Sequence, residues 1–309
     1  MKKSLFSKLV AVEKIANGSK LKRLFYASYK YSFALLHRLL LYPYQKKSKE
    51  VQTANFFNEK MTIRLPAATD IYLTGGKTHS SEIKLAKFLI QQLKEGDCFI
   101  DIGAHYGYFT LLGATLVGSK GQVLSFEASP NTYGVLRKNV QNHPTITALN
   151  KAISNSSESI TFFEFPNLYS EYNSMDIQQF EQEEWITKYP PKKHIIEAID
   201  LSTFITESKC HPSIIKIDVE GAEYKVIQGA SSYLQQHRPM IVMEYLSPER
   251  GNTPHSAAVQ LLNKLGFDAY TIDNNGLLKK EEALDSFLKI HQLDSDNVVF
   301  LKREVSRKY

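Results

Sequence analysis

The chain has 309 residues, which is enough for one large domain or two modest ones, and its formal net charge is +6. Hydrophobic residues make up 43% of the chain and charged residues 23%, values near the averages for globular proteins, which exclude a disordered or fibrous chain. The only cysteines, Cys98 and Cys210, are too few for a disulfide framework, and we interpret both as free thiols in a reducing compartment.

The positive charge is concentrated in residues 1–50, which hold twelve Lys and Arg against two Glu, a net charge of +10. Within them, the apolar and aromatic segment 24–44 is interrupted by Lys30 and Arg38, so it is a poor membrane span. We predict a basic, apolar helical extension over 1–65. It can pack on the main domain as a helix, contact an anionic membrane or a protein partner from the periphery, or bind nucleic acid.

The first two alternatives are favoured. The remaining residues are slightly acidic, with 26 Lys and Arg against 30 Asp and Glu, as is ordinary for a cytosolic enzyme. No small-residue cleavage site follows the apolar segment, as a signal peptide would require. We therefore expect a cytoplasmic protein that does not bind nucleic acid, with peripheral contact at the inner face of a membrane through residues 1–50 as an alternative.

After Pro66, short apolar runs alternate with helical patterns, which predicts βα units, a parallel sheet and a single doubly wound α/β domain over 66–309. Ser256 is expected to cap a late helix that stops at Gly266. The period is lost over 166–193, where we predict an irregular insert on the acceptor side of a site. The expected strands are 98–102, 122–126, 145–153, 159–165, 214–219, 240–245, 269–272 and 298–301.

A candidate ligand site follows the first of these strands. The apolar strand delivers Asp101 and then two glycines, Gly103 and Gly107, at the mouth of a helix. Because glycine has no Cβ atom, this turn can lie flat against an amino acid or a nucleoside. Glu127 ends the next strand, where its carboxylate can accept hydrogen bonds from both hydroxyls of a ribose. Together these residues predict a nucleoside cofactor.

The spacing favours S-adenosylmethionine over a nicotinamide dinucleotide. A dinucleotide needs glycines and helix N–H groups around its pyrophosphate, usually as G-x-G-x-x-G, and a nearby carboxylate would repel the phosphates. Here the glycines are spaced G-x-x-x-G, and Asp101 precedes the first of them. The ammonium and sulfonium of S-adenosylmethionine are stabilised by such a carboxylate, so an NAD-dependent dehydrogenase is the less favoured reading.

Three further carboxylates follow buried strands. Asp218 and Glu220 come after the apolar residues 214–217, and Glu244 ends the apolar run 240–243, so all three are expected at the sheet edge where α/β proteins bind ligands. A carboxylate there can remove the proton from a hydroxyl acceptor. Asp218 is the first candidate base and Glu244 the second, whereas Glu220 serves the site or orders the following turn. The three can also converge on a metal ion, but no spacing demands it, and we predict no obligatory metal.

The sequence resembles the FkbM family of methyltransferases from about residue 72 to residue 301. The resemblance implies a class I methyltransferase fold, Rossmann-like, with a mostly parallel seven-stranded sheet. It also implies S-adenosylmethionine as the methyl donor and a hydroxyl acceptor on a sugar, glycan or secondary metabolite. The residues that carry it are DIGAHYGYFT at 101–110, Phe126 and Glu127 followed by Pro130, and IKIDVEGAE at 215–223 ahead of Val226, Gly229 and Ala230.

The same resemblance implies the residues that hold the cofactor. Most members have Asn where this chain has His105, but both side chains can donate a hydrogen bond. An alternative is a catalytically silent domain that binds the cofactor or a glycan as the partner of a biosynthetic enzyme. The implied contacts are Asp101, Gly103, Ala104, His105 and Gly107 for the methionine part, Glu127 and Ala128 for the ribose, and Asn150 and Ala152 for the adenine region.

Overall fold

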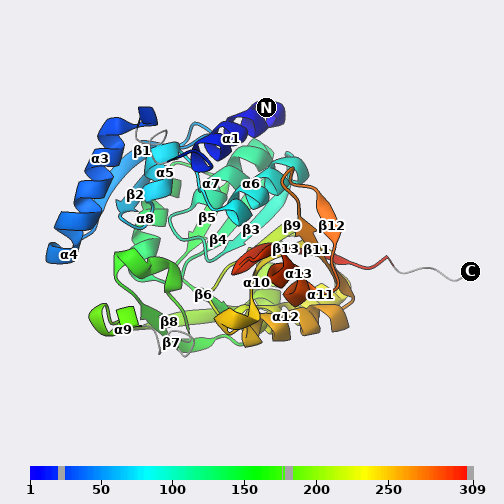
Figure 1. Ribbon diagram of the computed structural model, residues 1–309. Coiled ribbons are helices and arrows are strands. Elements are labelled where there is room, and N and C mark those ends of the chain that lie inside the picture. The colour runs from blue at the N-terminus through cyan, green and yellow to red at the C-terminus, as the bar shows by residue number, and fades with distance from the viewer. Residues whose placement is uncertain (20–24, 176, 178–183, 305–309) are drawn as a thin grey trace, which may run out of the picture.

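The centre of the molecule is an eight-stranded sheet with the order β12-β11-β13-β10-β9-β3-β4-β5 (Figure 1). Five adjacent strands, β10, β9, β3, β4 and β5, are parallel to one another, whereas β13 runs antiparallel to both β10 and β11. The structure is a computed structural model and describes residues 1–19, 25–175, 177 and 184–304. The strands are β3 (Cys98–Ile102), β4 (Gln122–Phe126), β5 (Ile146–Leu149), β9 (Pro212–Ile217), β10 (Met240–Leu246), β11 (Phe267–Ile272), β12 (Leu278–Lys280) and β13 (Ser295–Lys302).

Helices cover both faces of this sheet, because its central strands are apolar on both sides. Phe99 and Ile214 point into the hydrophobic core on one face, and their neighbours Ile100 and Ile215 point into the core on the other. This is the doubly wound α/β arrangement that the sequence predicted, with the short edge strand β12 added to the seven expected strands. One face carries α6 (Ser80–Gln92), α7 (Tyr108–Val117) and α8 (Pro130–Val140), and the other carries α10 (Leu201–Ser208), α11 (Glu223–Gln236), α12 (Thr253–Lys264) and α13 (Leu284–His291).

The N-terminal extension packs on the domain through its first helix. Leu5 and Leu9 of α1 are buried in the same core as α6, and Glu13 forms an ion pair of 2.7 Å with the buried Lys87. Among the described residues, no helix is long and apolar enough to cross a membrane. The elements are α1 (Lys2–Ala16), α3 (Ser28–Leu36), η1 (His37–Leu41), α4 (Tyr42–Gln45), β1 (Lys49–Ala54), β2 (Lys60–Leu65) and α5 (Thr69–Thr74). The prediction of a helical extension over 1–65 is therefore corrected at its end, where β1 and β2 pair as an antiparallel hairpin.

A second, three-stranded sheet with the order β6-β8-β7 lies beside the main sheet. Its first strand corrects one prediction, because residues 145–153 are not a single strand. The chain leaves the main sheet after Leu149 and joins the smaller one at Ala152. The elements here are β6 (Ala152–Ser154), β7 (Glu158–Glu164), η3 (Asn167–Tyr172), α9 (Glu184–Lys188) and β8 (Lys192–Asp200).

Two other local predictions can be compared with the structure. Ser256 does not cap its helix, since α12 begins at Thr253 with Asn252 as the N-cap residue and Pro254 in the first turn, where a missing N–H is harmless. The predicted irregular insert 166–193 contains only the short helices η3 and α9 before β8 begins, and its residues 176 and 178–183 lie outside the described part of the chain. The remaining short helices are η2 (Gly118–Lys120) and η5 (Pro248–Arg250).

Candidate functional site

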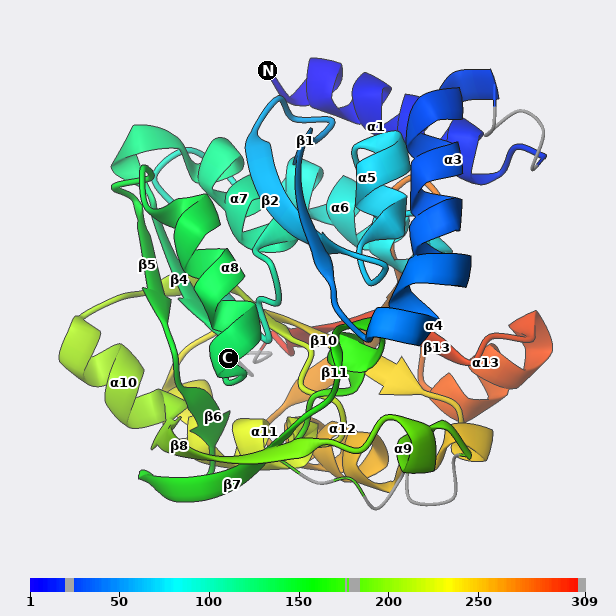
Figure 2. The same cartoon turned by 90° about the vertical axis from the view of Figure 1, so that its left-hand side faces the viewer.

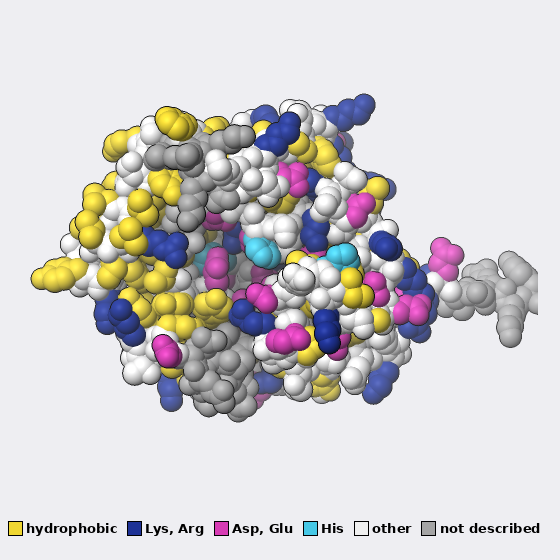
Figure 3. Space-filling view, in the orientation of Figure 1, with side chains coloured by type: hydrophobic (Ala, Val, Ile, Leu, Met, Phe, Trp, Pro, Cys, Tyr) yellow, Lys and Arg dark blue, Asp and Glu magenta, His cyan; other side chains and the backbone are white. Residues whose placement is uncertain are grey.

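A cavity of about 590 Å³ opens at the carboxyl ends of β3, β4, β9 and β10. Its volume is in the range of small-molecule and cofactor sites. Figure 3 shows the hollow in the middle of one face of the molecule, with acidic and histidine side chains gathered around it. Of the residues predicted from the sequence, eight line the cavity: Gly103, His105, Glu127, Ala128, Ala152, Asp218, Glu220 and Glu244.

The two glycines of the first turn are required by contacts within the protein. Both have a positive φ, +77° at Gly103 and +89° at Gly107. A Cβ atom on Gly103 would lie 1.7 Å from the carbonyl oxygen of Asp218, and one on Gly107 would lie 2.7 Å from Leu136. The sequence argument, that the missing Cβ atoms make room for a ligand, therefore has to be corrected. The glycines let the β3 turn approach the β9 loop and α8, and only Gly103 lines the cavity.

Asp101 lies behind the cavity wall and acts through a neighbouring lysine. It is fully buried, accepts a hydrogen bond of 2.7 Å from Thr110 and lies 3.2 Å from the ammonium of Lys216. The same ammonium reaches the carboxylate of Asp218 at 3.3 Å. Burial opposes the charge on Lys216, but Asp101 and Asp218 together raise its pKa above the usual range. Sequence reasoning missed this lysine, although it stands in the 215–223 motif.

Glu127 is oriented by the backbone around it. Its two carboxylate oxygens accept hydrogen bonds from the N–H groups of His105 at 2.8 Å and Ser129 at 2.9 Å. Burial raises the pKa of Glu127 to about 7. Each carboxylate oxygen retains a second acceptor site, so the group can still accept a hydrogen bond from a ligand hydroxyl. Asn150 does not line the cavity; its amide donates to the carbonyl oxygens of Glu127 and Ala128 and so holds this loop.

His105 has a left-handed backbone conformation, with φ at +50°, which is uncommon for residues other than glycine but which Asn, Asp and His adopt more often than the rest. Burial lowers the pKa of its imidazole to about 4, so the ring is neutral at neutral pH. Its Nε2 lies 3.1 Å from the hydroxyl of Ser170, which donates its own proton to the carbonyl of Asn167. Nε2 therefore carries the hydrogen. Ala104, the residue before, is buried in the turn and does not line the cavity.

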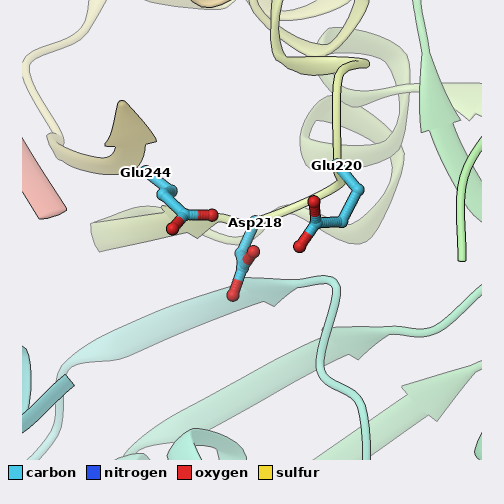
Figure 4. Close-up of side chains that lie close together, drawn as sticks. All are labelled: Asp218, Glu220 and Glu244. Atoms are coloured by element: carbon cyan, nitrogen blue, oxygen red, sulfur yellow. The ribbon is translucent and has the colours of Figure 1, made fainter. Parts of the chain in front are cut away.

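Three carboxylates converge in the cavity, as predicted for the ends of neighbouring strands. Figure 4 shows the side chains of Asp218, Glu220 and Glu244 turned toward one another, and oxygen atoms of all three lie within 4.8 Å of each other. Burial and the nearby charge of Asp218 raise the pKa of Glu244 to about 8. Burial, together with the charge of Glu244, also raises the pKa of Glu220. The cluster therefore holds protons at neutral pH. The absence of an obligatory metal stays a prediction.

Glu223, the last residue of the 215–223 motif, has a structural place. It is buried and accepts hydrogen bonds from the N–H groups of Val219 and Gly221, which fixes the turn between β9 and α11. His255 contacts the same carboxylate at 3.3 Å. Glu223 therefore orders this turn, whereas the side chain of Glu220 lines the cavity.

Other cavity residues come from segments that carry no motif. Lys77 precedes α6 and pairs with Glu82 at 2.8 Å and with Glu171 at 3.4 Å. These acids, with Asp70, raise its pKa against the opposing effect of burial. Only the irregular composition of the insert pointed toward any of these residues. The lining residues that sequence reasoning missed include Arg38, Lys77, Glu171 and Arg250.

Comparison with known proteins identifies the family. The model described as "Methyltransferase FkbM domain" matches residues 101–269, and that of protein-L-isoaspartate(D-aspartate) O-methyltransferase matches residues 45–155. Hexuronic acid methyltransferase AglP of Haloferax volcanii is 26% identical over 168 residues, which are 52% of this chain and 61% of AglP. The match therefore spans less than two thirds of the length of AglP.

Two further proteins are similar to this chain. "Methyltransferase 1" of Beauveria bassiana is 27% identical over 187 residues, which are 55% of this chain and 72% of that protein. The crystal structure of methyltransferase FkbM from Methylobacillus flagellatus superimposes with a TM-score of 0.43 and 12% identity, over 76% of this chain and 52% of that one.

Proposed function

Since the chain belongs to the FkbM family of methyltransferases and uses S-adenosylmethionine as its cofactor, we propose that it methylates a hydroxyl oxygen of a sugar, glycan or secondary metabolite. The hexuronic acid named for AglP supports a sugar acceptor. The observation that carries the proposal is the convergence of Asp218, Glu220 and Glu244 within 4.8 Å in the cavity. A hydroxyl is a weak nucleophile at neutral pH and gains most from a nearby proton acceptor.

The cavity has the charge that a cationic cofactor requires. Among the described residues, its lining holds eight Asp and Glu against four Lys and Arg. Even with Glu220 and Glu244 protonated, six carboxyl groups remain against four cations, which favours the ammonium and sulfonium of S-adenosylmethionine over the pyrophosphate of a dinucleotide. Glu127, the backbone of Gly103 and His105, and the small side chains of Ala128 and Ala152 would hold the cofactor. When bound, the cofactor supplies an electrophilic methyl group, and the protein aligns the acceptor oxygen with it and excludes water.

Asp218 is the proposed base. The raised pKa of Glu244, about 8, leaves that carboxyl protonated at neutral pH. Asp218 lies 3.3 Å from the ammonium of Lys216, and this ion pair holds its carboxylate at the end of β9, where it lines the cavity. The acceptor hydroxyl would hydrogen-bond to Asp218 and pass its proton there as the oxygen takes up the methyl group. Glu244 is the second candidate, because a group that titrates near the working pH is a good proton acceptor once it is ionised.

Transfer of a labelled methyl group tests this proposal. The purified chain and labelled S-adenosylmethionine would be incubated with sugar, glycan and glycolipid fractions, and the labelled product analysed for its methylated atom. We expect a methyl ether. Label on nitrogen or carbon would contradict O-methylation. Calorimetric binding of S-adenosylhomocysteine without transfer to any fraction would favour the silent binding partner, and binding of NAD in its place would favour a dehydrogenase.

A further inference from the structure

The helical segment 28–45, formed by α3, η1 and α4, exposes an apolar surface beside the cavity. Figures 1 and 2 show this segment on the outside of the molecule, and Figure 3 shows hydrophobic side chains over it next to the hollow. Isolated exposed apolar residues are ordinary, but a contiguous group marks an interaction surface. The outer helical face, as we call it, consists of side chains that are each at least half exposed: Tyr29, Leu36, Leu39, Leu40 and Tyr44.

These side chains are not needed to attach the segment to the domain, because its opposite side does so. Ala34 and Tyr42 are buried, and the Tyr42 hydroxyl accepts a hydrogen bond of 3.0 Å from the N–H of Leu168. Lys30 donates to the carbonyl oxygen of Tyr72 at 3.1 Å. The segment is thus held in place from within. Its outer apolar residues gain nothing from folding, so their burial has to come from a partner.

The charge of the segment identifies that partner. The segment itself contains two basic residues, Lys30 and Arg38, and no Asp or Glu. Over the longer stretch between Glu13 and Glu50, the chain holds nine Lys and Arg and no acidic residue. Lys46 and Lys47 are exposed at the end of the apolar face. Exposed Leu and Tyr next to basic side chains, without acidic ones, are typical of helices that lie in the interface of an anionic bilayer. We propose that the outer helical face docks on the surface of an anionic lipid membrane, without crossing it.

The docked face would bring the cavity to the lipid surface. Arg38 belongs to η1, in the middle of the segment, and also lines the cavity. The segment therefore forms part of the cavity wall and the docking face at once. Docking itself does not depend on the reaction that the cavity performs. If the methyl acceptor is carried on a lipid, docking would deliver it to the cavity. Only this delivery of the acceptor rests on the proposed function.

Vesicle binding of the full chain tests the docking face directly. The protein would be sedimented with vesicles of phosphatidylglycerol and phosphatidylcholine, and with vesicles of phosphatidylcholine alone. We expect binding only to the anionic vesicles, and binding at least about tenfold weaker for the double variant Leu36→Gln/Leu40→Gln, since two apolar side chains would no longer enter the interface. The matched control is Leu277→Gln/Ile290→Gln, which changes two exposed apolar residues elsewhere.

Several outcomes would overturn docking on an anionic membrane. They are failure of the wild-type chain to bind either vesicle, equal binding to both, and equal loss in the control variant. Size-exclusion chromatography supplies a further outcome. If the wild-type chain is a dimer that Leu36→Gln/Leu40→Gln converts to a monomer, and no vesicle binds, a second copy covers the face instead. Because no methyl transfer is measured, these results leave the proposed function to its own test.

Discussion

The two sides of the cavity are built in different ways. One, the motif side, comes from residues 101–152, which form consecutive strand ends and turns of β3, β4 and β6. The other, the assembled side, brings together Arg38, Lys77, Tyr172 and Arg250 from four distant segments. Local sequence patterns determine the first side, since strand, turn and carboxylate are adjacent in the chain. The second exists only after tertiary packing. We therefore expect cofactor binding to depend on the motif side and acceptor recognition on the assembled side.

The largest expected effect is at Asp218, in the acid cluster between the two sides. Asp218→Asn keeps the shape of the side chain but removes its basicity, so turnover should fall by about 10²–10⁴-fold while cofactor affinity stays nearly unchanged. Labelled-methyl kinetics and calorimetry with S-adenosylhomocysteine measure the two quantities. A comparable loss of cofactor affinity would make Asp218 a binding residue and pass the proposed role to Glu244. Full activity would remove Asp218 from catalysis.

The motif side is tested at Glu127. Glu127→Ala removes a carboxylate that lines the cavity, and loss of charge-assisted hydrogen bonds should weaken S-adenosylhomocysteine binding by roughly 1–3 kcal/mol. Calorimetry measures this, with Glu158→Ala on the exposed edge of β7 as the control. Circular dichroism checks that the variant is still folded, because Glu127 also binds the backbone N–H groups of His105 and Ser129. Unchanged affinity in a folded variant would exclude Glu127 from the cofactor site.

The same division explains how much the sequence could predict. Buried parallel strands such as β4 and β9 are largely apolar, and their ends, with Glu127 and Asp218, were placed correctly at the sheet edge. The roles of Asp101, Gly103 and Gly107 were not predicted correctly. Whether such a residue faces a ligand or another loop depends on which loops meet in the folded chain. The split of residues 145–153 between two sheets likewise depends on long-range pairing with β8. Arg38 had no local signal at all.

The acid cluster should also appear in the pH dependence of stability. The pKa of Glu244, about 8 in the folded chain, exceeds its usual value of 4.5, so the folded chain keeps a proton that the unfolded chain loses. This makes the free energy of unfolding fall as the pH rises from about 4.5 to about 8. Glu244→Gln should remove that loss. The full shift corresponds to between about 4 and 5 kcal/mol, and solvent access to the partly buried carboxyl reduces it, so we expect a stabilisation relative to wild type of roughly 2 kcal/mol at pH 8.

Urea unfolding at a series of pH values measures the difference between Glu244→Gln and wild type. The control is Glu207→Gln, on the exposed surface of α10, which should follow the wild-type curve. The opposite trend, with the Gln variant losing stability relative to wild type as the pH rises, would contradict the protonated state assigned to Glu244. It would also remove the reason for preferring Asp218 as the carrier of negative charge.

The smallest expected effect tests the assembled side at Arg38. Arg38 lines the cavity from the N-terminal extension, far in sequence from the motif side, so Arg38→Ala should leave S-adenosylhomocysteine affinity unchanged. A guanidinium at the cavity wall contributes to the binding of a polar acceptor by about 1 kcal/mol, and its loss should raise the KM for the acceptor about fivefold with little change in kcat.

The matched control is Lys47→Ala, an exposed basic residue of the same segment that does not line the cavity. Both variants would be assayed without vesicles, on a water-soluble form of the acceptor found by methyl labelling, so that membrane docking plays no part. A raised KM in Arg38→Ala alone ties acceptor recognition to the extension. If Arg38→Ala instead weakened cofactor binding, the two sides would not act separately, because a residue outside the motif side would then be holding the cofactor.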